Sequence, residues 1–175
     1  MKKGFTLIEL LIVIAILAIL ATVVVLVLNP AQLLAEARDG QRFSDVAAVR
    51  DAVVFYTGTV SSPTIGTTVG CTAGGATGFS GAPVCGTTGV YKVDGTGWVD
   101  VDLTAATGGS PLATLPRDPT NSTTYFYSYR GENTNKTFEV DAVLESTRYK
   151  ITEDKDGKDG GDNSSFYEVG TNLYL

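Results

Sequence analysis

Residues 1–28 read MKKGFTLIELLIVIAILAILATVVVLVL, and this stretch decides the fold. From residue 10 to residue 28 the chain has no charge, and Thr22 is the one polar side chain. A run of this length predicts a membrane-spanning helix. At ~1.5 Å per residue, a helix over residues 5–28 extends roughly 36 Å, which exceeds a hydrocarbon core of ~30 Å. The two lysines before the run place the N-terminus on the cytoplasmic side.

Glu9 is an acidic residue inside this apolar segment. A carboxylate at the centre of a membrane helix costs on the order of 3 kcal/mol on insertion scales, and less near an end, where the side chain reaches the headgroups. Two interpretations follow. Glu9 is either an interfacial acid without a special role, or a group that needs a cationic partner from another molecule.

A secretory signal peptide is the main alternative for this segment. It would combine a basic start, an apolar core of ~7–15 residues and a cleavage site after that core. Here the apolar core is longer, and Pro30 is followed by a helical pattern. The small residue Gly4 instead precedes the apolar run. The sequence therefore favours a retained helix over a cleaved signal peptide.

The residues around Gly4 resemble a known leader. Residues 1–10, MKKGFTLIEL, are similar to the class III leader of type IV pilins and type II secretion pseudopilins. The resemblance implies cleavage between Gly4 and Phe5 by a membrane prepilin peptidase, and N-methylation of Phe5 by the same enzyme. It also implies that Glu9 meets the free amino group of a neighbouring subunit during filament assembly.

Electrostatics supports the same pairing of Phe5 with Glu9. Cleavage after Gly4 would remove both lysines and create a new ammonium group on Phe5. Glu9 would then have a cationic partner, and the Coulomb attraction is weakly screened in an apolar environment. We therefore expect Phe5 and Glu9 to form the subunit–subunit contact.

Composition limits the classes of function. The 175 residues leave room for one domain beyond the helix. Net charge is −6, and removal of residues 1–4 leaves 11 basic residues against 19 acidic ones, or −8. This balance argues against a nucleic-acid partner. Without histidine, a nucleophile–base pair would need unusual partners, and no phosphate-binding glycine motif is present. We therefore do not expect an enzyme.

Cys71 and Cys85 are the two cysteines, 14 residues apart. The chain has neither a CxxC pattern nor a histidine, which argues against a zinc site. Both cysteines follow the membrane helix and so lie outside the cytoplasm, where an oxidising environment favours a disulfide. Two free thiols are the alternative.

Residues 29–57 continue the helical pattern. Asn29 and Pro30 suit a helix start, and Pro30 kinks or restarts the helix because it has no backbone N–H. Apolar residues then recur at helical spacing, at Phe43, Val46, Ala47, Val53 and Val54. Of these, we expect Phe43, Val46 and Val53 to pack on the domain core. Charged residues populate the remaining face, which is available to neighbouring subunits: Glu36, Arg38, Asp39, Arg42, Asp45 and Asp51.

The rest of the chain predicts a β-rich head. Residues 58–89 are rich in Gly, Thr, Ser and Pro and predict a long, exposed loop stapled by the disulfide, or a plain spacer. Residues 90–103 predict two strands joined by a turn at Asp94 and Gly95, with Asp100 and Asp102 on a solvated face rather than at a metal. Further strands are expected over residues 125–129, 137–146 and 166–169.

Two features of the head resemble pseudopilins. The segment LPRDP at residues 115–119, followed by a tyrosine-rich strand, is similar to a pseudopilin pattern. We expect these tyrosines to pack in the sheet rather than stack on a ligand. Residues 153–163, EDKDGKDGGDN, resemble in composition the acidic loop in which some major pseudopilins bind calcium.

The acidic loop offers oxygen ligands without a known loop pattern. An EF-hand needs D-x-D/N-x-D/N-G with a glutamate six residues after the glycine, and no register here supplies it. Hard carboxylate ligands for Ca²⁺ are nonetheless available, at Asp154, Asp156, Asp159 and Asp162. A calcium site and a solvated charged loop are the alternatives, and we expect no other cofactor.

Together these patterns predict an α+β, pilin-like fold, with a long N-terminal helix packed on a small antiparallel sheet. The expected divisions are a leader (1–4), an apolar helix (5–28), its amphipathic continuation (29–57), a disulfide-stapled loop (58–89) and a sheet domain (90–175).

The resemblance implies a structural subunit of a type IV pilus. Its partners would be identical subunits in a helical filament, prepilin peptidase and an assembly platform. The precursor would lie in the bacterial inner membrane, and the assembled protein in an extracellular pilus or a periplasmic pseudopilus. A type II secretion pseudopilin is the first alternative. A bitopic, membrane-anchored binding module that is never processed is the second.

Overall fold

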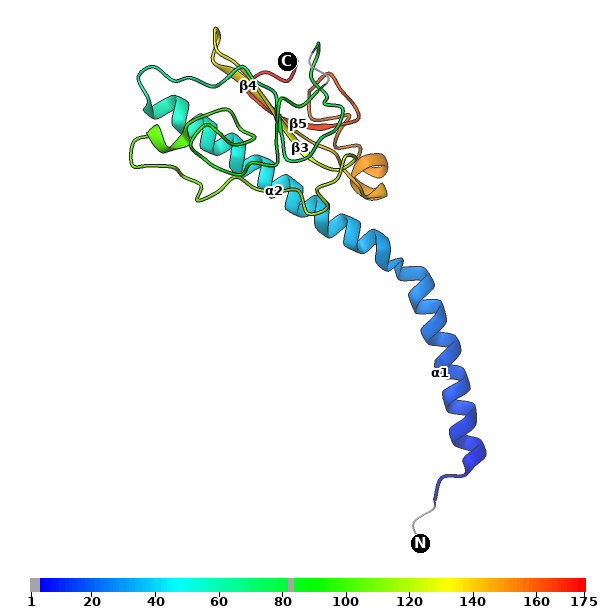
Figure 1. Ribbon diagram of the computed structural model, residues 1–175. Coiled ribbons are helices and arrows are strands. Elements are labelled where there is room, and N and C mark those ends of the chain that lie inside the picture. The colour runs from blue at the N-terminus through cyan, green and yellow to red at the C-terminus, as the bar shows by residue number, and fades with distance from the viewer. Residues whose placement is uncertain (1–3, 82–83) are drawn as a thin grey trace. The chain divides into compact units, whose positions relative to one another are not determined.

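The computed structural model describes residues 4–81 and 84–175, and Figure 1 shows its ribbon. The chain divides into two units, with the boundary after Ala35. The first unit holds α1 (Leu7–Leu28), and the second holds a sheet and most of α2 (Pro30–Thr59). The predicted α+β class, a long apolar helix followed by a small sheet, is confirmed. Residues 1–3 of the predicted leader lie outside the described residues.

The helix α1 is apolar on every side. None of the side chains described in it is buried, and exposure ranges up to 82% at Leu7. Thr22 donates its hydroxyl to the carbonyl oxygen of Ala18 (2.9 Å), so this polar group is satisfied within the helix. By length and composition the helix is able to cross a membrane. A helix of this kind needs apolar surroundings.

The predicted break at Pro30 is confirmed. Asn29 ends α1 in a left-handed conformation (φ 41°), which asparagine tolerates better than most residues. The helix restarts at Pro30, where the amide of Gln32 donates to the carbonyl oxygen of Asn29 (2.9 Å). α2 then ends at Thr59, close to the expected end near residue 57.

The head contains a five-stranded sheet in the order β2-β1-β3-β4-β5. Three of its strands, β3 (Tyr127–Glu132), β4 (Thr137–Ala142) and β5 (Tyr167–Gly170), are antiparallel neighbours. β1 (Gly70–Cys71) pairs antiparallel with β3, and β2 (Thr87–Thr88) pairs parallel with β1. The three longer strands are confirmed where the alternating pattern predicts them.

The main core lies between α2 and one face of the sheet. Tyr127 donates its hydroxyl to Asp45 of α2 (2.9 Å), and Tyr129 donates to the carbonyl oxygen of Ile65 (2.7 Å). These tyrosines are packing residues, as expected. The core combines α2, the segment before β3 and the strands, and it includes Val46, Val49, Val53, Trp98, Val101, Leu103, Phe138, Val140 and Ala142.

The prediction of two strands within residues 90–103 is wrong. This segment holds turns, an isolated bridge between Asp94 and Asp102, and a 3-10 helix over Leu103–Ala105. The carboxylates of Asp94 and Asp102 each accept hydrogen bonds from the backbone amide and hydroxyl of the threonine two residues on. Such local bonds compete with a strand ladder. The apolar side chains between these two aspartates are buried, as the pattern predicts. Asp100, expected on a solvated face, is instead half-buried and accepts the amides of Thr67 and Thr68.

The glycine-rich segment 58–89 is less exposed than predicted. It supplies β1 and β2, and its residues Val69 and Phe79 are buried in a second apolar cluster on the other face of the sheet. Phe126 and Phe166 complete this cluster. The segment therefore covers a sheet face, which the composition of its residues did not indicate.

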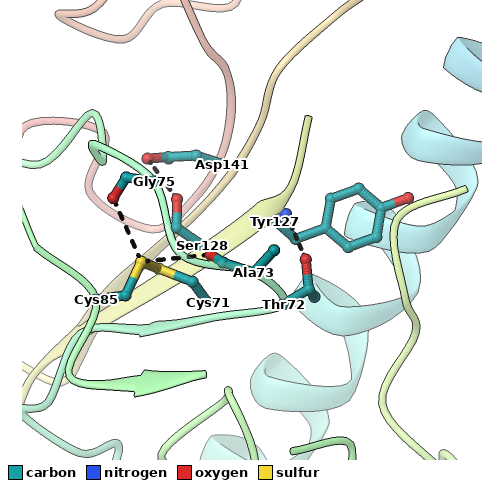
Figure 2. Close-up of a disulfide and its surroundings, with 8 residues drawn as sticks. All are labelled: Cys71, Thr72, Ala73, Gly75, Cys85, Tyr127, Ser128 and Asp141. Carbon is teal, nitrogen blue, oxygen red and sulfur yellow. Dashed lines mark hydrogen bonds between the residues drawn. A yellow bond between two sulfur atoms is a disulfide. The ribbon is translucent and has the colours of Figure 1, made fainter. Parts of the chain in front are cut away.

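The predicted disulfide between Cys71 and Cys85 is present (Figure 2). It connects β1 to the end of the covering segment, and the two Cα atoms lie 5.7 Å apart. Next to it, Thr72 accepts a hydrogen bond from the amide of Tyr127 (3.0 Å). The bridge thus holds the covering segment against the sheet.

Removal of this bridge is expected to lower the free energy of unfolding by about 3 kcal/mol, because it closes a loop of ~15 residues. The measurement is urea unfolding of the full chain in detergent, followed by the fluorescence of the buried Trp98. The Cys71→Ser/Cys85→Ser variant and reduced wild-type protein should unfold at the same urea concentration. Midpoints equal to that of the oxidised protein would refute a stabilising role.

Arg42 links α2 to loop residues of the head. Its guanidinium is fully buried and donates to Asp118 (2.7 Å) and to Asp39 (2.7 Å). Asp39 also accepts the backbone amides of Glu145 and Ser146. Asp39 and Arg42 therefore hold the helix on its own head, which corrects the expectation that they face neighbouring subunits.

Candidate functional site

The peptide bond between Gly4 and Phe5 lies in non-helical backbone before α1. The side chain of Phe5 is 81% exposed. A Cβ atom added to Gly4 would meet no atom within 4 Å. An exposed segment outside regular structure is the kind of backbone that a peptidase can bind. The predicted cleavage and methylation positions are thus accessible in the chain.

Thr6 and Glu9 begin α1 with a capping box. The hydroxyl of Thr6 accepts the amide of Glu9 (3.2 Å), and the Glu9 carboxylate accepts the amide of Thr6 (3.0 Å). The Thr6 hydroxyl also donates to the same carboxylate oxygen (2.9 Å). Two amide groups that a helix start leaves unpaired are thereby satisfied.

The capping box gives Glu9 a role within its own chain. It holds the carboxylate on the backbone amide of Thr6, the residue that follows Phe5, whose nitrogen cleavage would free. A negative charge is also favourable there because of the helix dipole. The interpretation of Glu9 as an acid without a role is therefore incomplete. The T-x-x-E spacing of residues 6–9 is a sequence signal for this box, which the sequence analysis did not use.

The four aspartates of the predicted calcium loop lie in different environments. Asp159 accepts the amides of Gly161 (3.0 Å) and Glu168 (2.7 Å), and Asp154 pairs with Lys158 (3.4 Å). Asp162 is exposed and Asp156 is buried. Within residues 4–81 and 84–175, these four do not converge as one group of metal-ligating oxygens. Calcium binding by this loop stays a prediction.

The structure instead gathers three acids that the sequence analysis did not single out. Glu139 and Asp141 of β4 and Glu168 of β5 place carboxylate oxygens within 4.8 Å of one another, and all three side chains are buried. Burial raises the pKa of all three carboxyl groups, and in Glu168 it does so to about 8. Strand alternation predicts a shared face for these acids, but not that this face is covered.

Comparison with known protein families gives a match in the N-terminal segment. Residues 1–25 match the family model described as the prokaryotic N-terminal methylation motif. Neither a curated protein nor a solved structure shows significant similarity to the chain. The matched range contains the Gly4–Phe5 bond, the Thr6–Glu9 capping box and most of α1. In these residues the chain carries the class III leader of type IV pilins and pseudopilins.

Proposed function

We propose that this protein is a structural subunit of a type IV pilus, made as a membrane-anchored precursor. The proposal rests on one observation, the exposed apolar surface of α1 next to a methylation motif. This helix exposes apolar side chains on every side and follows directly on the accessible Gly4–Phe5 bond of a methylation motif. Such a surface is stable only in lipid or against other apolar helices.

Assembly exchanges one apolar environment for another. Cleavage leaves a chain that starts at Phe5 with an ammonium group, and its helix moves from the membrane into a bundle of identical helices. Each Glu9 carboxylate, already held at the start of its helix by Thr6, receives the ammonium group of a neighbouring subunit. Repeated contacts between different surfaces of identical subunits produce an open helical filament.

A pseudopilus is the closest alternative, and it shares the leader and the helix. The segment 115–119 resembles pseudopilins, while the disulfide-stapled segment 58–89 favours an exposed fibre. In this chain Asp118 accepts two bonds from the buried Arg42, so the segment has a folding role that suits either assembly.

The test is intact mass and N-terminal sequencing of protein from the membrane and from sheared surface material. A chain that starts at methylated Phe5 in sheared fibres supports the pilus subunit. Processed chains confined to the membrane fraction support the pseudopilin instead. A chain that retains Met1 in both fractions refutes processing and leaves a membrane-anchored module.

Gly4→Val provides the matched control for this test. No atom lies within 4 Å of a Cβ at this position, so the substitution leaves the folded chain intact. The variant should stay unprocessed in the membrane and be absent from sheared material. Normal processing of the variant would show that the peptidase does not read this glycine.

A further inference from the structure

Glu139, Asp141 and Glu168 form a buried acidic cluster on the sheet face opposite α2. Asp141 lies directly across from Glu168 in the ladder between β4 and β5, and Glu139 is two residues along the same strand. The exposed fractions of the three residues are 1%, 0% and 2%. Like charges directly opposite each other destabilise a sheet, so this arrangement needs a compensating partner.

Two carboxylate oxygen atoms of the cluster accept no hydrogen bond. Asp141 accepts the hydroxyl of Ser128 with one oxygen (3.3 Å), and Glu168 accepts the amide of Asn163 with one oxygen (3.4 Å). The other oxygen of each carboxyl group is buried without a hydrogen bond. Among the ion pairs in the described part of the chain, none involves the cluster. Buried carboxylates without partners are strongly unfavourable.

Two segments cover the cluster at close range: segment 58–89, which contains Gly78, and the residues from Gly161 to Asn163. A Cβ atom on Gly161 would lie 1.6 Å from a Glu168 oxygen, and one on Gly78 would lie 3.0 Å from an Asp141 oxygen. Asn163 donates its side-chain amide to the carbonyl oxygen of Gly78 (3.2 Å), which ties the two covering segments together. Figure 2 shows Asp141 next to Ser128, beside the disulfide that holds one of these segments. The cluster is therefore enclosed by backbone rather than by apolar side chains alone.

We propose that Glu139, Asp141 and Glu168 bind a divalent cation of the oxygen-preferring class, and that Ca²⁺ fits best. Ca²⁺ accepts 6–8 oxygen ligands at 2.3–2.6 Å in flexible geometry, so two of its ligands are at most ~5 Å apart, whereas Mg²⁺ demands a near-ideal octahedron and usually keeps several waters. The three ligand oxygens lie within 4.8 Å of one another. A zinc-type site is less suited, because the chain has no histidine and both cysteines are in the disulfide.

Charge favours the same occupant. With all three carboxyl groups ionised the cluster carries a charge of −3, and a bound divalent ion reduces that charge to −1. The ion also uses the two oxygens that have no hydrogen bond. Ca²⁺ takes 6–8 oxygen ligands, so the three carboxyl groups would supply part of its shell and other oxygen ligands the remainder.

One residue of the cluster also belongs to the lining of a cavity. Glu168 lines a cavity of about 450 Å³, together with Asp159 of the acidic loop. The basic side chains in its lining are each paired with an acid, so they do not present a bare positive charge to an entering ion: Arg50, Lys155 and Lys158.

The test uses the full-length chain in detergent, treated with EDTA and titrated with CaCl₂ or MgCl₂. Thermal unfolding and calorimetry are measured for wild type, Asp141→Asn and Glu168→Gln, which keep the shape of the side chains. The matched control is Asp154→Asn/Asp162→Asn, because it removes two charges from the predicted calcium loop and none from the cluster.

The wild type and the loop control should bind Ca²⁺ and melt at higher temperature in its presence. Each cluster variant should bind Ca²⁺ at least tenfold more weakly, while its metal-free form is as stable as wild type or more so, because one buried charge is gone. Wild type that does not respond to millimolar Ca²⁺ overturns the proposal. Loss of binding in the loop control, with normal binding in Asp141→Asn, also overturns it and places the ion in the loop.

This proposal is independent of the pilus assignment. Calcium binding is measured on the isolated chain, whereas processing is measured on chains from cells. Failure of either result leaves the other unaffected.

Discussion

Replacement of Arg42 by methionine is expected to lower the free energy of unfolding of the head by about 3–5 kcal/mol, the usual effect of removing one partner of a buried ion pair. Arg42 is fully buried and donates to Asp118 and Asp39. Burial alone would lower the pKa of Arg42, but its bonds to Asp118 and Asp39 outweigh burial and raise it. Methionine fills a similar volume but leaves both carboxylates without the guanidinium.

Arg50→Met is the matched control, on the same helix. Arg50 pairs with Asp51 (2.8 Å), but their side chains are 41% and 68% exposed. An exposed pair contributes about 0–1 kcal/mol, so this variant should unfold close to wild type in urea. Equal unfolding midpoints for the two variants would contradict a special role for Arg42.

A second substitution separates buried charge from packing. Addition of Asp118→Asn to Arg42→Met removes one of the carboxylates left unpaired. The asparagine oxygen keeps the bonds that Asp118 accepts from the amides of Thr120 and Asn121. The double variant should therefore recover part of the lost stability, and the coupling is measured by a double-mutant cycle.

Glu9→Gln is expected to abolish filament assembly without affecting leader cleavage or the stability of the head. Removal of one partner of a pair in an apolar environment costs about 3–5 kcal/mol, which is more than ~100-fold in the affinity of one subunit for the next. Glutamine still completes a capping box, so the start of α1 is retained. The measurement is the amount of protein in sheared material, with intact mass to confirm processing.

Thr6→Ala is the complementary control for Glu9. It removes the hydroxyl that bonds to Glu9 and costs the helix start about 0.5–2 kcal/mol, but it keeps the charge. Filaments should still form from this variant. If Glu9→Gln assembles normally and Thr6→Ala does not, Glu9 acts as a helix cap and the proposed pairing with Phe5 is wrong.

The N-terminal part of the fold was predictable because its signals are local. A charge-free run longer than a bilayer is thick predicts an apolar helix whatever follows it. Asn29 and Pro30 end one helix and start another through their own backbone preferences, φ 41° in one case and a missing N–H in the other. The class III leader is likewise read from consecutive residues.

In the head, the alternation of residues predicted which side chains are buried, but it did not always predict the secondary structure of the segment. The alternation of apolar residues and aspartates before residue 104 correctly predicts that Val101 and Leu103 are buried and that Asp102 is exposed, whereas Asp100 is half-buried. It did not show that the turn predicted at Asp94 would lack flanking strands, or that Asp102 would cap a 3-10 helix instead of lying in a strand. Arg42 looked like a surface charge, because its partner Asp118 lies 76 residues away in the chain.

The sequence by itself determined the apolar helix, its break, the leader and the sheet face that each residue of β4 and β5 occupies. Only the tertiary structure decided whether those faces meet water. Glu139, Asp141 and Glu168 alternate with core residues as solvated side chains do, yet the disulfide-held segment and the residues around Asn163 fold over them. Burial depends on contacts between segments distant in the chain, and strand periodicity carries no information about such contacts.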